Sequence, residues 1–259
     1  MPGADGARIA VLGRGRWGTK VRSMLERAAF DVVPLGAVRQ RDGESDPEYV
    51  ARMSAALGEA RCTHAWLCVP PGRHVPLQVE AAARRGIHVI GEKPWPYDPA
   101  DLGAVAAGHH GVAPRVLVCF EYVLLSGVQA WRESQGGGAG LTFHGVFSVA
   151  APDRLGIPAL WNMGSHLAAI REWAVPESSV GSLRARYDAE PERRVWLEDA
   201  SGTRVSEVDF LSSAEPILER FAAGATEGRG PVTELDPGFA ARVSRVVAAL
   251  EPWPGGADR

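Results

Sequence analysis

The sequence predicts an α/β fold: an N-terminal Rossmann domain with a doubly wound parallel sheet, followed by a reduced α+β domain with an open, mainly antiparallel sheet. The first domain is predicted by short apolar runs that alternate with helical patterns, and by a glycine-rich turn directly after the first run. The second is predicted by successive strand-like segments that lack this alternation. We place the two domains at residues 1–122 and 123–259.

Each element of the first domain follows from a local pattern. Strands buried in a parallel sheet are short continuous apolar runs, and such runs occur at residues 8–12, 32–38, 64–69, 87–90 and 115–120. Apolar residues at helical spacing predict helices at residues 21–28, 47–57 and 75–85. A fourth helix can begin at Asp98 or Asp101, since either can cap it, and runs to about residue 108.

The second domain follows a glycine-rich stretch at residues 136–140, which predicts a flexible connection. Strands are predicted at residues 141–150, 182–188, 193–198 and 203–210, the last two joined by a turn at 199–202. Helices at residues 214–223 and 237–250 complete the chain. This order of elements is typical of an open antiparallel sheet packed against helices.

Composition narrows the classes of function. A formal net charge of -3 over 259 residues argues against binding to nucleic acid or to an anionic membrane surface, because both demand a basic patch. No apolar stretch approaches the ~20 residues that span a bilayer, and the first residues lack a basic segment followed by an apolar one, so we expect a cytoplasmic protein. The three cysteines lie in or beside apolar runs, which predicts buried, reduced thiols and no metal site.

The glycine-rich turn is the first motif with chemical meaning. Gly13, Gly15 and Gly18 have the spacing that allows a tight turn, a close backbone approach to phosphate, and close packing of helix on strand. Arg16 and Trp17 lie in the same turn, where the amides at the start of a helix attract an anion. We therefore expect residues 1–122 to bind a dinucleotide; the alternative is a purely structural turn.

The segment after the second strand bears on the choice between NADP and NAD. In NAD-binding domains an acidic residue usually stands here and accepts hydrogen bonds from the ribose hydroxyls. Arg39 and Arg41 occupy the segment instead, and two guanidinium groups can bind a 2'-phosphate. We expect NADP, with NAD as the alternative if these arginines are only solvated and Asp42 contacts the ribose.

Lys93 is a candidate for proton transfer. It is one of two lysines in the chain, the other being Lys20, and it directly follows the fourth predicted strand. Arginine does not release its proton at physiological pH, whereas a lysine in a dry pocket can. The simpler reading is a surface lysine at the end of a strand.

Three ordered motifs, at residues 13–18, 68–74 and 86–94, resemble the Gfo/Idh/MocA oxidoreductases, the glucose-fructose oxidoreductase and inositol dehydrogenase group. The chain is short for that family, which implies a shortened C-terminal domain. The resemblance also implies that Lys93 reaches the reacting carbon–oxygen group of the substrate. It implies that the nicotinamide is lined by the turn after the third strand and by the segment around Lys93, with Val69, Pro70, Pro71, His74 and Glu92.

A second family signature reads approximately Asp-x-Gly-x-His-x-x-Asp, and residues 162–169 match it in part. The histidine is kept as His166, but Asn162 and Ala169 replace the two carboxylates. Asn162 can hydrogen-bond a substrate hydroxyl and His166 can act as acid or base; the alternative is a structural histidine. After the fifth strand, Glu121 or Tyr122 can face the cleft, pair with a local arginine or pack.

Together these features predict an NAD(P)-dependent oxidoreductase. It would transfer hydride between nicotinamide and a small polar carbonyl, alcohol or imine. We expect the reductive, biosynthetic direction, because the replaced carboxylates weaken base catalysis more than acid catalysis. The shortened C-terminal domain and the use of arginine in place of lysine suggest a ketosugar-like or imine substrate of secondary metabolism. The alternative is a nucleotide-binding sensor or accessory protein without turnover. The resemblance also implies a homodimer formed through the C-terminal sheet.

Overall fold

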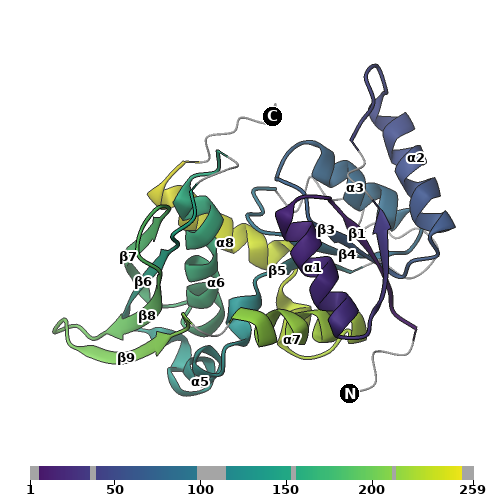
Figure 1. Ribbon diagram of the computed structural model, residues 1–259. Coiled ribbons are helices and arrows are strands. Elements are labelled where there is room, and N and C mark those ends of the chain that lie inside the picture. Colours follow the sequence, from purple (N-terminus) through teal and green to yellow (C-terminus); the bar gives the residue numbers. More distant parts are fainter. Residues whose placement is uncertain (1–5, 36–38, 98–114, 153–155, 212–213, 253–259) are drawn as a thin grey trace. The chain divides into compact units, whose positions relative to one another are not determined.

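The computed structural model describes residues 6–35, 39–97, 115–152, 156–211 and 214–252 (Figure 1). By its internal contacts the chain divides into two compact units. The first takes in the described parts of Met1–Cys119 together with Phe221–Ala241, and the second takes in Phe120–Arg220 and Arg242–Pro254. The first unit thus includes a segment that lies about 100 residues beyond its fifth strand, a return of the chain that the sequence did not indicate.

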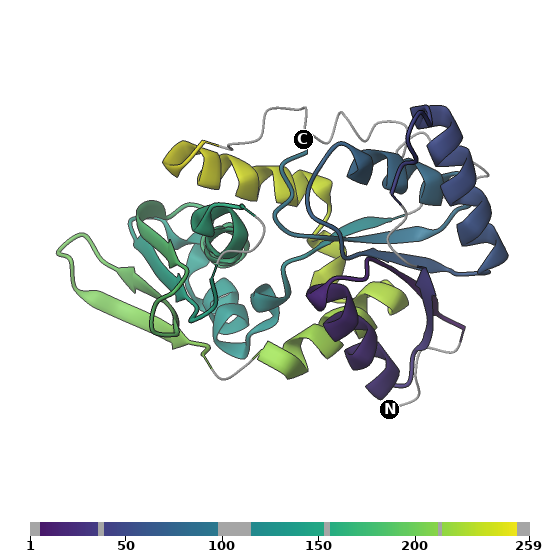
Figure 2. The same ribbon diagram turned by 45° about the horizontal axis from the view of Figure 1, so that its top comes forward.

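The first unit is built on a five-stranded parallel sheet of order β2-β1-β3-β4-β5. Its strands are β1 Arg8–Leu12, β2 Asp31–Leu35, β3 His64–Leu67, β4 His88–Glu92 and β5 Val116–Cys119. Its helices are α1 Arg16–Arg27, α2 Asp46–Glu59 and α3 His74–Ala83. Helices α2 and α3 lie side by side on one face of the sheet and α1 lies on the other (Figure 2). All residues of β3 and β5 are buried, as expected for strands covered on both faces.

The second unit contains a four-stranded mixed sheet of order β7-β6-β8-β9. Its strands are β6 Thr142–Ser148, β7 Ser179–Arg186, β8 Glu192–Glu198 and β9 Arg204–Asp209, of which only the β6–β7 pair is parallel. Helix α6 Ser165–Ala174 packs on β6, where a side chain at Gly145 would press on Leu167 at 3.1 Å. The remaining elements are η3 Glu121–Leu124, α5 Ser126–Ser134, η4 Gly136–Gly138 and η5 Leu160–Gly164 in this unit, with α7 Ala214–Glu227, η6 Pro231–Glu234 and α8 Pro237–Leu250 toward the end of the chain.

The predicted fold class is confirmed, since a doubly wound parallel sheet precedes a second, mainly antiparallel sheet. The stretch at residues 136–140 differs from the flexible connection expected there: it contains the turn η4, and a side chain at Gly138 would lie 2.7 Å from Val175. Gly138 therefore allows close packing, whereas a side chain at Gly136 or Gly140 would meet no atom of the described residues within 4 Å. The predicted helix at residues 98–108 and the end of the second predicted strand, at residues 36–38, lie outside the described residues.

All three cysteines are buried free thiols, as predicted. Within the described ranges, no helix combines the length and apolarity needed to cross a bilayer.

Candidate functional site

The first unit presents the features of a nucleotide site at one edge of its sheet. Strands β1, β2, β3 and β4 end at this edge, at Leu12, Leu35, Leu67 and Glu92. Chain connections leave β1 and β3, which are neighbours, in opposite directions. In open α/β sheets, ligands bind outside the carboxyl ends of the strands at such a switch point.

The glycine turn between β1 and α1 leaves no room for side chains at two positions. Gly13 has φ +124°, and a Cβ there would overlap the carbonyl of Cys68 at the end of β3. A Cβ on Gly18 would overlap the carbonyl of Gly13. At Gly15, by contrast, a Cβ would meet no atom of the described residues within 4 Å, so this glycine borders open space. The turn thus packs tightly on its inner side and leaves its outer side accessible.

The start of α1 can bind an anion. Among the described residues no side chain caps the helix at Gly15, and its first turn carries no acidic residue. The first amides and the positive end of the helix dipole are therefore available to a phosphate. Arg16 is exposed and Trp17 half-buried beside this turn, with Lys20 Nζ 5.5 Å from the centre of the Trp17 ring. These features fit a pyrophosphate.

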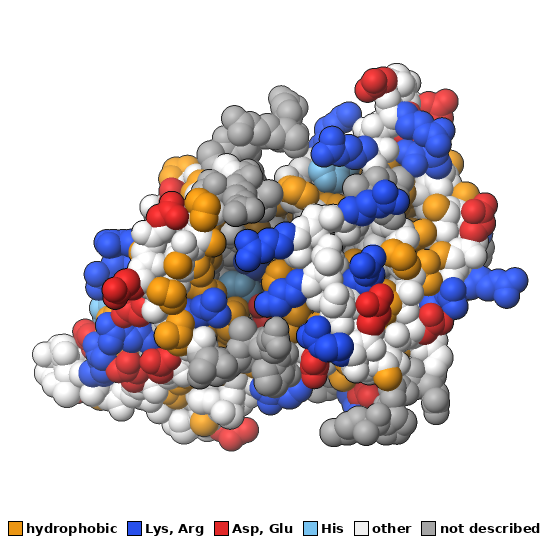
Figure 3. All heavy atoms as spheres, in the orientation of Figure 1, with side chains coloured by type: hydrophobic (Ala, Val, Ile, Leu, Met, Phe, Trp, Pro, Cys, Tyr) orange, Lys and Arg blue, Asp and Glu red, His pale blue; other side chains and the backbone are white. Residues whose placement is uncertain are grey.

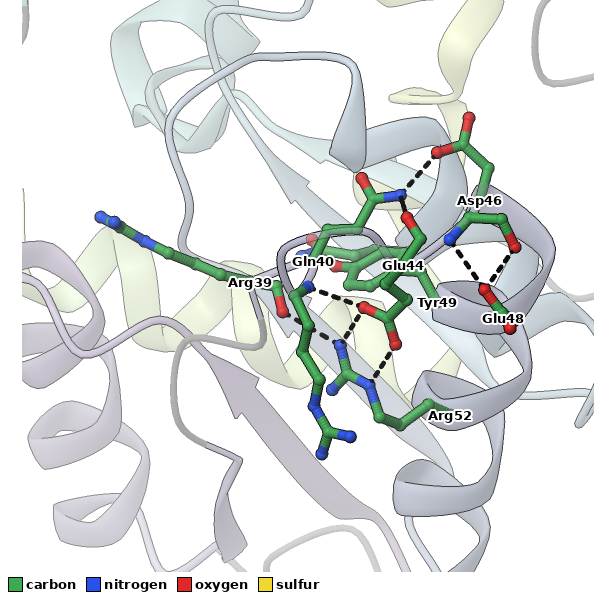
Figure 4. A network of polar contacts seen from close by, with 10 residues as sticks. Arg39, Gln40, Glu44, Asp46, Glu48, Tyr49 and Arg52 are labelled. Atoms are coloured by element: carbon green, nitrogen blue, oxygen red, sulfur yellow. Dashed lines mark hydrogen bonds and ion pairs between the residues drawn. The ribbon is translucent and has the colours of Figure 1, made fainter.

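The loop that carries Arg39 and Arg41 is held by a carboxylate and a guanidinium (Figure 4). Glu44 accepts a hydrogen bond from the Arg41 backbone N–H at 2.8 Å and another from Arg52 Nε at 2.6 Å. Arg52 Nη2 donates in turn to the Arg39 carbonyl at 3.0 Å. The hydrogen bond from Arg52 is the main reason that the pKa of Glu44 is lowered to about 2. Glu44 therefore stays ionised, and the loop has a fixed backbone.

Charged side chains of both signs surround this loop. The side chains of Arg39 and Arg41 are both exposed, and in Figure 4 that of Arg39 extends away from the network. Arg73, at the start of α3, donates from Nη2 to Gln40 Oε1 at 3.0 Å. The pKa of His74 is lowered by its burial and further by the charges of Arg73 and Arg39. Arg52 and Arg73 are paired with Glu44 and Asp46, so the exposed guanidinium groups of Arg39 and Arg41 are the feature of this loop that suits a phosphate.

Two hydrogen-bond anchors flank Lys93. Before it, Glu92 at the end of β4 accepts a bond from Trp66 Nε1 at 2.8 Å. After it, the Tyr97 hydroxyl accepts a bond from the Gly72 N–H at 2.6 Å and donates to the Gly72 carbonyl at 3.0 Å. Lys93 itself is half-buried, and its peptide bond to the following proline is cis.

The Tyr97 bonds tie the segment around Lys93 to the turn that contains Val69, Pro70 and Pro71. Our sequence reasoning missed Trp66 and Tyr97. Only the position of Tyr97 close behind the Glu-Lys-Pro motif could have drawn attention to it.

His166 lies in the second unit, in the first turn of α6, and is 3% exposed. Its Nδ1 is 3.9 Å from Oε2 of Glu121, which belongs to the turn η3 that follows β5 and is itself buried. Glu121 thus lies beside a histidine 45 residues further along the chain, a pairing that the sequence did not indicate. Tyr122 packs beside it, with its ring centre 4.6 Å from that of His166.

Asn162 lies in the π-helical turn η5, just before α6. Its Nδ2 donates a hydrogen bond to the Tyr187 hydroxyl at 2.8 Å, and that hydroxyl donates to the Ile157 carbonyl at 3.0 Å. Asn162 thus contacts Tyr187, whereas His166 lies beside Glu121 and Tyr122. Tyr187 had no signal in the sequence.

The predicted site residues thus fall into two groups. The first unit gathers its members at one edge of the sheet, namely Gly13, Gly15, Arg16, Trp17, Gly18, Arg39, Arg41, Val69, Pro70, Pro71, His74, Glu92 and Lys93. The second unit holds Asn162 and His166 at the start of α6. The roles assigned to both groups stay predictions.

Comparison with known proteins gives matches in structure only: no protein-family model and no curated protein sequence matches the chain. The WlbA (WbpB) dehydrogenase from Thermus thermophilus, solved with NAD and UDP-GlcNAcA, superimposes with a TM-score of 0.68 at 15% identity, covering 98% of this chain and 97% of that one. GenD2 from gentamicin A biosynthesis, solved with NAD, gives 0.66 at 14% identity, covering 94% and 92%. The scyllo-inositol dehydrogenase from Lactobacillus casei, solved with NAD(H) and scyllo-inositol, gives 0.67 at 12% identity, covering 95% and 96%.

These structure neighbours are dehydrogenases of the Gfo/Idh/MocA type, the group that the sequence motifs resemble. At this level of identity the likeness shows a shared fold. The predicted two-domain fold is confirmed over nearly the whole chain.

Proposed function

We propose that the chain is an NADP-dependent oxidoreductase that reduces a small polar carbonyl or imine, with a ketosugar-like compound as the leading substrate class. The observation that carries the proposal is the edge of the parallel sheet, where a glycine turn open to phosphate and a lysine between two hydrogen-bond anchors lie in one unit. The fold shared with dehydrogenases solved with NAD, UDP-GlcNAcA or scyllo-inositol supports it.

The preference for NADP rests on the loop between β2 and α2. Arg39 and Arg41 are exposed on a backbone that Glu44 and Arg52 hold in place. Two guanidinium groups in a fixed loop can form charge-assisted hydrogen bonds to a 2'-phosphate. The neighbours described above were solved with NAD, so this loop is where we expect the chain to differ from them.

When bound, the nicotinamide supplies or receives the hydride at the reacting carbon. In the reductive direction Lys93 gives its proton to the oxygen or nitrogen of the substrate, so that the heteroatom does not end the step as an anion. The two anchors on either side limit the positions open to Lys93. We assign to His166 the assistance of Lys93 in proton transfer, and to Asn162 the orientation of a substrate hydroxyl.

Nucleotide titrations test the cofactor. NADPH and NADH are titrated into the protein, and we expect NADPH to bind about 10- to 100-fold more tightly, as two charge-assisted hydrogen bonds would give. Arg39→Ala and Arg41→Ala should each reduce that ratio, whereas Arg27→Ala, which removes an exposed arginine at the far end of α1, should not. A wild-type preference for NADH would refute the cofactor assignment alone.

Turnover tests the reaction. NADPH oxidation is followed at 340 nm with a panel of ketosugars and cyclic imines, and NADP reduction with UDP-GlcNAcA and scyllo-inositol. Lys93→Met should lower kcat by about 100-fold or more, the usual effect of removing a general acid, with NADPH binding unchanged. Lys93→Arg, which keeps the charge but does not release a proton, should be equally impaired.

Replacement of both signature carboxylates favours a second candidate, a nucleotide-binding sensor or accessory protein without turnover. Binding of NADPH with no turnover on the panel, and no effect of Lys93→Met on any readout, would favour the sensor. A protein that binds neither nucleotide would refute both candidates. A homodimer through the sheet of the second unit belongs to the enzyme proposal and is tested by the mass of the protein in solution.

A further inference from the structure

Two buried titratable side chains of the second unit lie next to each other. His166, in α6, is 3% exposed, and Glu121, in the turn η3, is 6% exposed. His166 Nδ1 and Glu121 Oε2 are 3.9 Å apart, which is an ion-pair distance but too long for a hydrogen bond. The pair joins two elements that are distant in sequence, and the whole of it belongs to one unit.

Aromatic rings enclose the imidazole. The Tyr122 ring lies edge to face with it at a centre-to-centre distance of 4.6 Å, and Phe147 of β6 is nearly parallel to it at 5.6 Å. Phe120 stands perpendicular at 6.5 Å. An imidazole among these rings has little contact with water, so burial by itself favours its neutral form.

The charges around this ring cluster come from several elements. Glu121 and the phenol of Tyr122 come from η3, and Arg193 of β8 donates from Nη1 to the Tyr122 hydroxyl at 3.2 Å. The guanidinium of Arg193 lies 4.9 Å from the centre of the Phe147 ring, which also stacks on His166. Arg132 of α5 faces Trp173 at the other end of α6.

The carboxylate of Glu121 is in ion-pair contact with the imidazole. His144 of β6 points to the opposite side of the sheet, where it lies 3.3 Å from Glu198. A carboxylate within 4–6 Å favours the protonated imidazole and so opposes the effect of burial.

We propose that Glu121 is the positioning residue that keeps a proton available on His166, replacing the carboxylates that are absent from positions 162 and 169 of the chain. A histidine that is protonated near neutral pH can donate a proton, as a reduction requires. This assignment rests on the proposed function for its role in turnover. The coupling between the two side chains can be measured without nucleotide or substrate.

The test is an NMR titration of the full-length protein with labelled histidine. The chain has seven histidines, and the His166 signal is identified by its absence from His166→Gln. We expect Glu121→Gln to move the titration midpoint of His166 to lower pH by about one unit or more, as loss of an adjacent opposite charge should. Glu172→Gln removes another carboxylate from α6, one that pairs with Arg171 and Arg242, and should leave the midpoint unchanged.

An unchanged or raised His166 midpoint in Glu121→Gln would overturn the proposal. If that variant does not fold, the reciprocal measurement decides: the Glu121 carboxyl signal should titrate at higher pH in His166→Gln than in the wild type, because the neighbouring cation is gone. Equal values in the two proteins would overturn the proposal as well.

The outcomes for the enzyme and for the pair are distinguishable. If His166 and Glu121 titrate as a coupled pair but the protein turns over no substrate, the proposed enzyme activity is refuted and the coupling between the two side chains is supported. With a turning-over substrate, Glu121→Gln should move the His166-dependent limb of the pH–rate profile to lower pH, while NADPH affinity stays the same. If Glu121→Gln instead lowers the rate equally at all pH values and leaves the midpoint of that limb unchanged, Glu121 has only a structural role.

Discussion

His64 should make the first unit sensitive to acid. It lies in β3, is 5% exposed, and its Nε2 is buried without a hydrogen-bond partner among the described residues. Burial above all, and then the nearby His88 and Arg115, lower the pKa of His64 from 6.5 to about 4. Between these two values the unfolded chain binds a proton that the folded protein does not, so stability falls as pH falls through this window.

The size of the effect follows from that shift. The difference of about 2.5 pKa units corresponds to about 3 kcal/mol of unfolding free energy once the pH is below both values. At pH 5 the same two pKa values give RT ln[(1+10^1.5)/(1+10^-1)], or about 2 kcal/mol. Above pH 7 the contribution is close to zero, because His64 is then neutral in both states.

Urea denaturation of the wild type and of His64→Leu at pH 8, 7 and 5 measures the contribution of His64 to the pH dependence of the unfolding free energy. Leucine cannot take up a proton, so the loss of stability between pH 7 and pH 5 should be about 2 kcal/mol smaller in the variant than in the wild type. The change between pH 8 and pH 7 should be the same in both proteins and serves as the internal control. Equal losses between pH 7 and pH 5 would refute the reasoning, since they would mean that His64 is not held neutral in the folded state.

Three further predictions concern the candidate nucleotide site. Gly13→Ala should destabilise the protein by about 2–3 kcal/mol in urea denaturation and weaken NADPH binding, because residue 13 has a positive φ and its methyl group would clash with the Cys68 carbonyl. Gly15→Ala, which has open space for its methyl group, should lower the unfolding free energy by less than 1 kcal/mol. Equal effects of the two substitutions would contradict the packing described for the turn. Glu44→Gln should reduce the NADPH-to-NADH affinity ratio several-fold with NADH binding unchanged, and an unaltered ratio would show that the loop needs no such support. Tyr97→Phe should cost about 1–3 kcal/mol by removing its two hydrogen bonds to Gly72, and a stability equal to that of the wild type would show that these bonds contribute nothing.

The parts of the fold that depend on local spacing could be predicted from the sequence. The turn at Gly13–Gly18 was predictable because a tight strand-to-helix turn restricts the residue type at fixed positions. Strands β1, β3 and β5 were predictable because strands covered on both faces are continuous apolar runs, whereas β2, at the edge of the sheet, has no buried residue. Helix α8 has the bounds that its apolar periodicity predicts.

The contacts that depend on long-range packing could not be predicted. Trp66 and Glu92 meet because β3 and β4 are paired, and no local pattern in either strand indicates which side chains lie together. The same holds for Glu121 and His166, whose side chains meet only once η3 and α6 pack together. Burial alone would have made His166 a core residue, and the neighbouring carboxylate is visible only in three dimensions.

The network around Glu44 has a practical consequence for redesign of the protein. Its bonds join Arg39, Arg41, Glu44 and Arg52, which all lie in one short stretch of sequence, and α2 begins within that stretch at its own capping box of Ser45 and Glu48. Tyr49 and Val50 of α2 are buried, so the part that can be exchanged as a block ends at the start of this helix. The proposed cofactor preference should therefore be transferable by grafting residues 39–48 from a dehydrogenase of the same fold with Arg52 retained, whereas the glycine turn, packed against the end of β3, has to be kept.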